Sequence, residues 1–152
     1  MADKIRPGTH NYFAYGSNMD QTQMAQRCPD SQMIGIASIK GYRFAIDEVG
    51  VATIIPDEAG TVYGILWQVS EDDVRRLDRY EGIAAGCYRR ESIPVQRQNN
   101  NDQDALVYIS NRPLWSQPWG TGSPYMDNIE RWAGFYEFPL EYLTELHQFT
   151  CD

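Results

Sequence analysis

Apolar residues along the chain fall into short runs, many of which alternate with small or polar positions, as in β-strands. Residues 12–15 are aromatic or small and predict a buried strand, and residues 61–69 carry the strongest strand pattern of the sequence. Gly41 separates two runs that we expect to be neighbouring strands, and Pro56-Asp57 closes the next. Strands are predicted at 12–15, 33–39, 42–46, 51–55, 61–69, 88–97 and 105–110.

Helical segments are indicated by capping residues in front of apolar positions at helical spacing. One helix is predicted from Asp20 to Arg27, because the residue before Pro29 avoids helical angles. A second begins after Ser70, with acids in its first turn, and ends at Gly82. Two more are expected near the carboxyl end, one starting at Ser123-Pro124 and one covering residues 139–149.

This order of elements predicts an α+β fold. We expect a mixed, largely antiparallel sheet of about six strands that closes into a small barrel, with flanking helices. At 152 residues the chain is expected to form a single domain over 1–152, long enough for one good core, with residues 1–10 as a flexible polar arm.

Composition narrows the function classes. The hydrophobic share is 42% and the charged share 22%, as is typical of a soluble globular protein. The net charge of -8 argues against a broad nucleic-acid-binding surface, which needs clustered Lys and Arg. No apolar run approaches the length of a membrane span, so no membrane partner is expected.

Cysteine and histidine usage argues against a disulfide framework and against a bound metal. Cys28, Cys87 and Cys151 are widely spaced and odd in number, and His10 and His147 lie near opposite ends. The first ten residues lack the apolar segment of a signal peptide, so the default expectation is a cytoplasmic location.

The stretch from Tyr12 to Met19 is the first candidate site. Gly16 permits backbone angles that other residues resist, and Ser17, Asn18 and Asp20 are all good helix N-cap residues. Ser17 and Asp20 also have the spacing of a capping box. Backbone N–H groups that converge where a strand turns into a helix attract a carboxylate or phosphate. The alternative is an ordinary strand-to-helix connection.

The second candidate is Glu81, in the last turn of the helix that ends at Gly82. A carboxylate there meets the negative end of the helix dipole, which disfavours the charged form. An enclosed Glu81 would be a candidate general base, whereas an exposed one would be an ordinary surface residue.

Three ordered motifs resemble the gamma-glutamylcyclotransferase-like family. They are Tyr-Gly-Ser-Asn-Met at 15–19, then Leu77-Asp78-x-x-Glu81-Gly82 with Gly86-x-Tyr88, and finally Ser123-Pro124-Tyr125 followed by Gly134 and Pro139-Leu140-Glu141-Tyr142. The similarity extends from about residue 12 to residue 146, nearly the whole chain. The resemblance implies the fold of that family, in agreement with the barrel predicted from the pattern.

The resemblance also implies an activity. Enzymes of this family let the α-amine of a gamma-glutamyl substrate attack its γ-amide carbonyl, which releases 5-oxoproline and an amino acid or amine. Such an enzyme needs a small-molecule gamma-glutamyl substrate and no cofactor. A non-catalytic binding module on the same fold is the alternative, and the oligomeric state, a homodimer among others, is left open.

By the same resemblance Glu81 is the catalytic acid/base. Tyr125 binds substrate, and Asn18 either caps the helix or contacts substrate. Tyr88 either offers its hydroxyl at the pocket wall or fills the core. The substrate-binding segment consists of Tyr12, Phe13, Ala14, Tyr15, Gly16 and Ser17.

The leaving group is the open question. Glutathione-specific relatives usually carry Tyr-Gly-Ser-Leu, so glutathione is disfavoured, and gamma-glutamyl amino acids and amines both remain. Candidate residues for a carboxylate on the leaving group are Lys40, Arg43, Arg89 and Arg90. The aromatic loop at 112–124 either covers a pocket as a lid or packs its tryptophans against the body.

Overall fold

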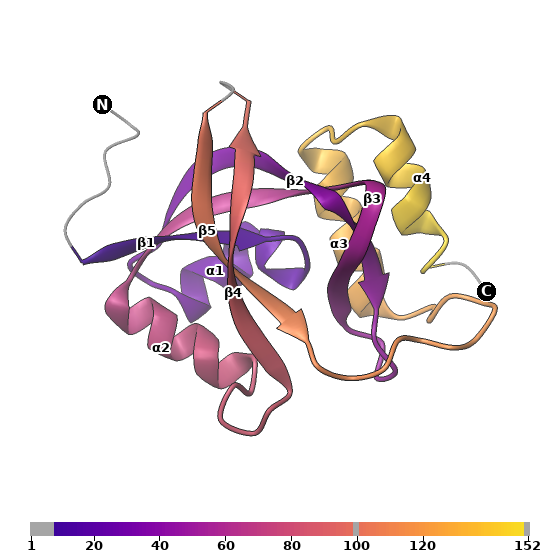
Figure 1. The fold of residues 1–152 in the computed structure, drawn as a ribbon, viewed down its shortest axis with the longest axis horizontal. Helices are drawn as coiled ribbons and strands as arrows, with labels where there is room; N and C mark the ends of the chain where they lie inside the picture. Colours follow the sequence, from indigo (N-terminus) through magenta and orange to yellow (C-terminus); the bar gives the residue numbers. More distant parts are fainter. Residues whose placement is uncertain (1–7, 99–100, 151–152) are drawn as a thin grey trace.

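The fold is an α+β barrel with helices at its edges, seen in a computed structural model that describes residues 8–98 and 101–150 (Figure 1). The expected fold class is confirmed. The elements are β1 (Thr9–Ala14), a 3₁₀ turn η1 (Ser17–Met19), α1 (Gln21–Arg27), β2 (Gln32–Ile46), β3 (Ala52–Ser70), α2 (Glu71–Tyr80), β4 (Tyr88–Arg97), β5 (Asp102–Ser110), α3 (Pro124–Phe135) and α4 (Leu140–His147).

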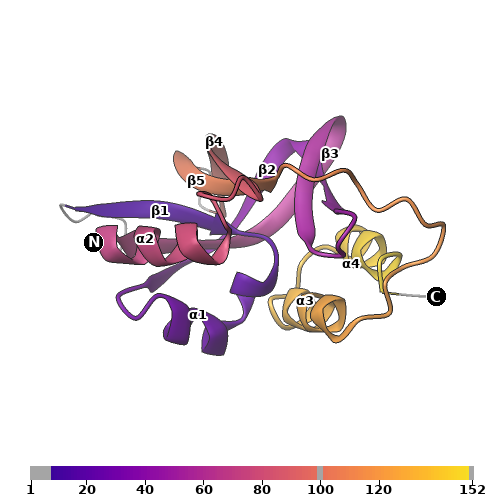
Figure 2. The ribbon, with the colours of Figure 1, turned by 90° about the horizontal axis from the view of Figure 1, so that it is seen from below.

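Five strands close the barrel in the order β1-β3-β2-β4-β5. Neighbouring strands are antiparallel except β1 and β5, which pair in parallel at Tyr12 and Leu106. Helices α1 and α2 lie beside β1, and α3 and α4 lie beside the outer part of β2 and β3 (Figures 1 and 2). The carboxyl ends of β1 and α2 lie in the same region of the molecule.

Two predicted strand breaks are wrong. β2 continues through Gly41, where the register with β3 shifts between Lys40 and Tyr42 and Gly41 takes a positive φ of 88°. β3 continues through Pro56, which is exposed and pairs with Tyr42. Gly41 therefore forms a bulge and Pro56 takes an edge position, and neither ends its strand. The pairing between β2 and β3 keeps both strands continuous through these residues.

Strands β1 and β3 approach each other closely at Gly64. A Cβ on this residue would lie 2.3 Å from the carbonyl oxygen of Ala14 and 2.7 Å from the ring of Phe13. Only glycine therefore lets β1 lie this close to β3. Phe13 is fully buried, so the contact joins the barrel core directly to the end of β1.

The N-caps of α2 and α3 are those predicted from the sequence, whereas the capping at α1 differs from the prediction. Ser70 and Asp73 form a reciprocal capping box on α2, and the hydroxyl of Ser123 accepts a hydrogen bond from the N–H of Met126 on α3. The predicted capping box of Ser17 with Asp20 is wrong. Asp20 itself is the N-cap of α1, because a 3₁₀ turn separates Ser17 from that helix.

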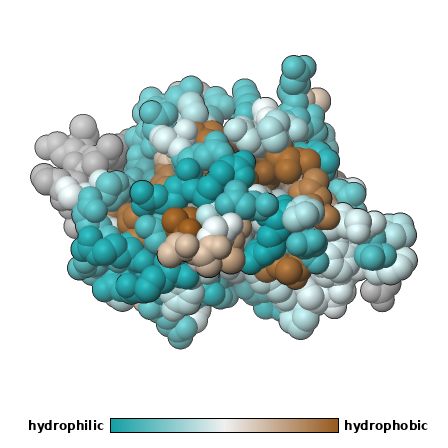
Figure 3. Space-filling view, turned by 60° about the horizontal axis from the view of Figure 1, so that its bottom comes forward, coloured by the Kyte–Doolittle hydropathy of each residue, from teal (hydrophilic) through white to brown (hydrophobic). Residues whose placement is uncertain are grey.

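The expected arm at residues 1–10 lies mostly outside the described residues. Thr9 and His10 are not part of an arm, because they already pair with Ser70 and Val69 as the start of β1. The exposed large hydrophobic side chains are scattered, and the face in Figure 3 is largely hydrophilic with small separate apolar areas.

Candidate active site

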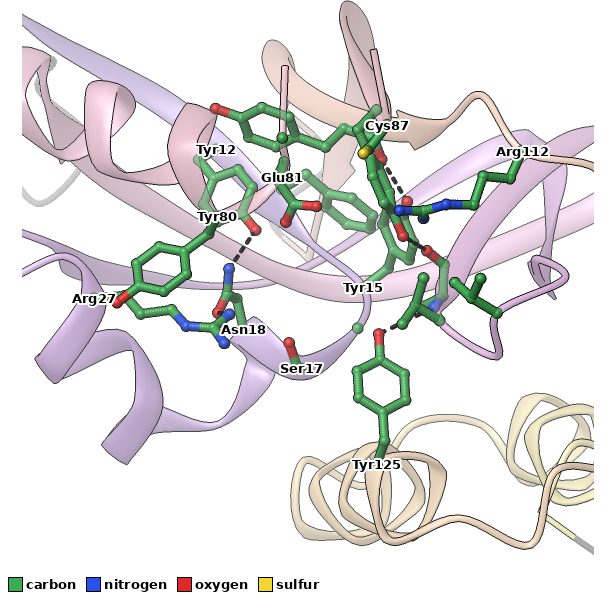
Figure 4. Close-up of a pocket in the computed structure, with 18 residues that line it drawn as sticks. Tyr12, Tyr15, Ser17, Asn18, Arg27, Tyr80, Glu81, Cys87, Arg112 and Tyr125 are labelled. Carbon is green, nitrogen blue, oxygen red and sulfur yellow. Dashed lines mark hydrogen bonds between the residues drawn. The ribbon is translucent and has the colours of Figure 1, made fainter. Parts of the chain in front are cut away.

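A cavity of about 270 Å³ opens where the end of β1, η1, the end of α2 and the start of β3 meet α3. Its size is near the roughly 300 Å³ lower end of small-molecule pockets, which limits its occupant to a small compound. Figure 4 shows the side chains around it. The lining consists of Tyr12, Phe13, Tyr15, Gly16, Ser17, Asn18, Arg27, Val49, Val51, Ala52, Tyr80, Glu81, Gly82, Cys87, Tyr88, Tyr108, Arg112 and Tyr125.

Glu81 brings a carboxyl group into this cavity (Figure 4). The residue is the C-cap of α2, its N–H donates to the carbonyl of Leu77, and Gly82 turns the chain away with a φ of 64°. Within the described residues no hydrogen-bond donor reaches the Glu81 carboxyl group. Both oxygens therefore remain available to a ligand.

Burial raises the pKa of Glu81 to about 7, from an ordinary value of 4.5. The guanidinium groups of Arg27 and Arg112 act in the opposite direction and limit this rise. A carboxyl group with a pKa near neutrality can both accept and donate a proton at physiological pH.

Gly16 is needed for space rather than for an unusual φ. Its φ is −118° and its ψ −133°, so the expectation of a backbone conformation reserved for glycine is wrong in φ. A Cβ at this position would instead lie 3.1 Å from the Cβ of Ala52 and 3.5 Å from the hydroxyl of Tyr125. A larger residue would push the turn that follows β1 away from these two walls of the cavity.

Asn18 connects the turn to two neighbouring walls. Its side-chain N–H₂ donates to the hydroxyl of Tyr12 at 3.0 Å, and its side-chain oxygen accepts from Arg27 at 3.0 Å and from Gln23 at 3.1 Å. The indole N–H of Trp67 donates to the Asn18 carbonyl at 3.2 Å. The side chain therefore ties the walls of the site together through its oxygen and one of its two N–H donors, and it caps no helix.

Three tyrosines join the walls through their hydroxyl groups. The Tyr125 hydroxyl accepts from the N–H of Ala52 at 3.0 Å, and the Tyr88 hydroxyl donates to the Ala52 carbonyl at 2.6 Å. The Tyr15 hydroxyl donates to the carbonyl of Tyr108. Because the Tyr125 oxygen acts as an acceptor here, its own proton remains available for a ligand.

Arg112 enters the cavity opposite Arg27 and is held by Asp47 (Figure 4). One guanidinium N–H donates to Asp47 at 3.0 Å, and this hydrogen bond is the main reason why the pKa of Arg112 is raised. Asp47 is fully buried and also accepts from Ser110 and from the N–H groups of Val49 and Val51. One buried carboxylate therefore orders both Arg112 and the rim at 49–51.

The cavity brings together nearly all site residues expected from the sequence. Tyr88 is buried and also lines the cavity, and it donates its hydroxyl proton to the Ala52 carbonyl. Ala14 does not line the cavity, since it ends β1 in register with Ile65 and its carbonyl lies against Gly64. The predicted residues present in the lining are Tyr12, Phe13, Tyr15, Gly16, Ser17, Asn18, Glu81, Tyr88 and Tyr125.

The four expected cationic candidates all lie outside this cavity. Arg43 lies 3.9 Å from Asp57, Arg89 is bound to Glu91 at 2.7 Å, and Arg90 lies 3.2 Å from Asp78. Lys40 is exposed on β2 and is not part of the lining either. These expectations were wrong because alternation along a strand does not show which end of a barrel a side chain reaches.

Sequence reasoning missed Arg27 and Arg112. Arg27 had a usable signal, because it lies nine residues after Asn18 at the end of the same turn-helix unit. Arg112 had none, since it meets Asp47 across 65 positions of sequence.

The loop at 112–124 contributes only Arg112 to the lining, so a lid over the cavity is not seen. Trp115 packs partly against the core, and its indole N–H donates to the carbonyl of Trp119 at 2.9 Å. Thr121 donates its N–H to the carbonyl of Phe149. The alternative of a loop packed on the body is therefore the one observed, although Trp119 itself is exposed.

Within residues 8–98 and 101–150, no group of three or more His, Cys, Asp and Glu side chains is arranged to hold a metal ion. None of the helices in that part of the chain is long and apolar enough to cross a membrane. Cys28 and Cys87 are free thiols, and Cys151 falls outside the described residues.

Residues 12–132 match the profile of the family described as gamma-glutamyl cyclotransferase, AIG2-like. The chain belongs to this family. Gamma-glutamylcyclotransferase from Homo sapiens is 25% identical over 146 residues, which cover 89% of this chain and 76% of the human protein. The protein of the same name from Bos taurus is 25% identical over 107 residues, covering 64% of this chain and 57% of the bovine one.

Solved structures of gamma-glutamyl cyclotransferase relatives share the barrel. One named gamma-glutamyl cyclotransferase superimposes with a TM-score of 0.80 at 23% identity, over 91% of this chain and 86% of that one. YkqA from Bacillus subtilis superimposes with a TM-score of 0.77 at 26% identity, over 93% of this chain. This chain spans about half of YkqA, 54% of its length.

Proposed function

We propose that the protein is a gamma-glutamyl cyclotransferase that converts a small gamma-glutamyl compound to 5-oxoproline and a free amine or amino acid. The observation that carries this proposal is Glu81, whose carboxyl group has no hydrogen-bond partner among the described residues and shares one cavity with Gly16 and Ser17. Membership in the gamma-glutamyl cyclotransferase, AIG2-like family supports the same activity.

Ring closure needs little from the enzyme beyond positioning and proton transfer. The substrate carries its own nucleophile, and holding the amine near the γ-carbonyl replaces a bimolecular encounter. The carbon–nitrogen bond of the lactam forms as the bond to the leaving nitrogen breaks. Over the whole reaction the α-ammonium nitrogen loses two protons, and the leaving nitrogen gains both.

In this proposal Glu81 carries those protons. Its carboxylate accepts one from the α-ammonium group, whose ordinary pKa of about 8 lies near the value of about 7 for Glu81. The resulting carboxylic acid donates to the leaving nitrogen, which would otherwise depart as an unstable amide anion. The restored Glu81 carboxylate takes the second proton from the ring nitrogen as the lactam forms, and the released amine binds that proton to become an ammonium ion. Such general acid–base catalysis contributes about 10²- to 10⁴-fold.

The turn at residues 16–18 would hold the negative end of the substrate. Within the described residues, the N–H groups of Ser17 and Asn18 have no acceptor, as expected at the start of a 3₁₀ turn. The hydroxyl group of Tyr125, whose proton is not used in its bond to Ala52, lies on the same side of the cavity as Ser17 (Figure 4). These donors can bind the α-carboxylate or the oxyanion that develops during attack.

The proposal includes a cytoplasmic location. Cys28 and Cys87 are free thiols, which fits a reducing compartment. Fractionation of the source cells with an antibody against the protein would test this point.

The test is incubation of the purified protein with gamma-glutamyl amino acids and gamma-glutamyl amines, with 5-oxoproline measured by chromatography. We expect conversion by the wild type and a loss of about 10²-fold or more in kcat for Glu81→Gln. No conversion together with measurable binding would contradict the enzyme and favour the non-catalytic binding module.

Glu81→Gln is expected to fold at least as well as the wild type above neutral pH. The folded state raises the pKa of Glu81 from 4.5 to about 7, so the folded protein binds more protons in that window and loses stability as pH rises through it. Glutamine removes this penalty. Thermal unfolding at pH 8 therefore separates a loss of chemistry from a loss of fold.

A further inference from the structure

Two arginines lie on opposite sides of Glu81 in the cavity (Figure 4). Both guanidinium groups are close enough to lower the pKa of the Glu81 carboxyl group. Their partners differ, however, and the difference gives the cavity two distinct cationic ends.

Arg27 belongs to the end that contains the turn. One of its N–H groups donates to Asn18 at 3.0 Å, and its guanidinium carbon lies 4.4 Å from the centre of the Tyr80 ring. This end already faces the N–H groups of Ser17 and Asn18, which the proposed function assigns to the gamma-glutamyl half of the substrate.

Arg112 forms the other end. Its hydrogen bond to the buried Asp47 and its position 5.9 Å from the centre of the Tyr88 ring fix the direction of the guanidinium. A guanidinium has five N–H donors, and within the described residues only the one to Asp47 has an acceptor. The side chain is 28% exposed, so the remaining donors can reach a ligand.

The position of Glu81 between these ends orders the substrate. If Glu81 serves both the α-nitrogen and the leaving nitrogen, the scissile amide must lie next to it. The gamma-glutamyl half then extends toward the turn, and the leaving group extends toward Arg112.

We propose that Arg112, held by Asp47, binds a carboxylate on the leaving group, so that the protein prefers gamma-glutamyl amino acids to neutral gamma-glutamyl amines of the same size. This inference rests on the proposed function. A guanidinium held in place by a carboxylate suits recognition of a second carboxylate, because its planar fork matches that group in two parallel hydrogen bonds.

The test compares gamma-glutamyl-alanine with gamma-glutamyl-alaninamide, which differ only by a carboxylate against a carboxamide. We expect the wild type to favour the first by about 10- to 100-fold in kcat/KM, the range for one hydrogen-bonded charged group. Arg112→Gln should remove this preference, mainly through KM, while Arg112→Lys keeps part of it. Arg43→Gln, an exposed arginine outside the cavity, is the matched control and should leave the ratio unchanged.

Binding to Glu81→Gln, measured by calorimetry, decides the inference independently of turnover. A preference for gamma-glutamyl-alanine that Arg112→Gln abolishes in this background supports it, even if the wild type converts neither compound and the proposed function fails. Equal binding of both compounds overturns it, even if both are converted and the proposed function stands. Thermal unfolding of Arg112→Gln and Arg112→Lys shows whether either variant is folded under assay conditions.

Discussion

The two ends of the cavity hold their arginines in different ways. Arg27 has neutral partners, an amide oxygen and an aromatic ring, whereas Arg112 has a fully buried carboxylate. Arg27 comes from the same turn-helix unit as Asn18, while Arg112 and Asp47 come from distant segments. The hydrogen bond that holds Arg27 is therefore local in sequence, whereas the one that holds Arg112 joins distant segments.

In the proposed function this difference separates two tasks. The end near the turn would bind the gamma-glutamyl half that all substrates share. The end near Arg112 would bind the variable leaving group, and it is assembled from the segments at residues 47–51 and 110–112. Changes at Asp47 and Arg27 should therefore have different consequences.

Asp47→Ala should have the largest effect on the fold. The substitution leaves Arg112 unpaired and removes the acceptor of Ser110 and of the N–H groups of Val49 and Val51. Arg112 is partly exposed and can turn to solvent, so the main cost comes from the donors left without an acceptor, about 1–3 kcal/mol of unfolding free energy for each buried one. Thermal or urea unfolding measures it, with Asp57→Ala on the exposed partner of Arg43 as the control. A loss below about 1 kcal/mol would contradict the role given to Asp47.

Arg27→Gln should impair all substrates alike. The variant loses the charged hydrogen bond to Asn18, so we expect kcat/KM to fall by about 10- to 100-fold. The ratio between gamma-glutamyl-alanine and gamma-glutamyl-alaninamide should stay at its wild-type value, unlike in Arg112→Gln. A change of that ratio in Arg27→Gln would break the division between the two ends.

The pH dependence of kcat/KM should also distinguish the two arginines, although the expected effect is smaller than those above. If ionised Glu81 accepts the first proton, kcat/KM rises with pH through a midpoint of about 7. Both guanidinium groups lower the pKa of Glu81, Arg27 more than Arg112, so removing either moves this midpoint upward. The shift should be larger in Arg27→Gln than in Arg112→Gln and absent in Arg43→Gln. A downward shift in either variant would contradict the assignment to Glu81.

Local signals in the sequence were sufficient for the elements nearest the chemistry. The cap at Ser70, the acids after it and the positive φ of Gly82 define α2 and therefore place Glu81.

The remaining features depend on pairing between distant segments. Pro56 reads as a break, yet a partner strand keeps β3 continuous through it. Arg89 was a candidate ligand for a carboxylate and Arg112 was not, yet in the closed barrel Arg112 lines the cavity and Arg89 does not. The sequence alone does not indicate which distant segments come together in the folded protein.

The closure of the barrel passes directly through the cavity wall. In the described residues the parallel register of β1 with β5 is the single pair of Tyr12 and Leu106. Tyr12 therefore belongs both to the shortest strand pairing of the barrel and to the lining of the cavity. A bound molecule in contact with Tyr12 would therefore stabilise the pairing of β1 with β5. Amide hydrogen exchange along these two strands would slow when the cavity is filled.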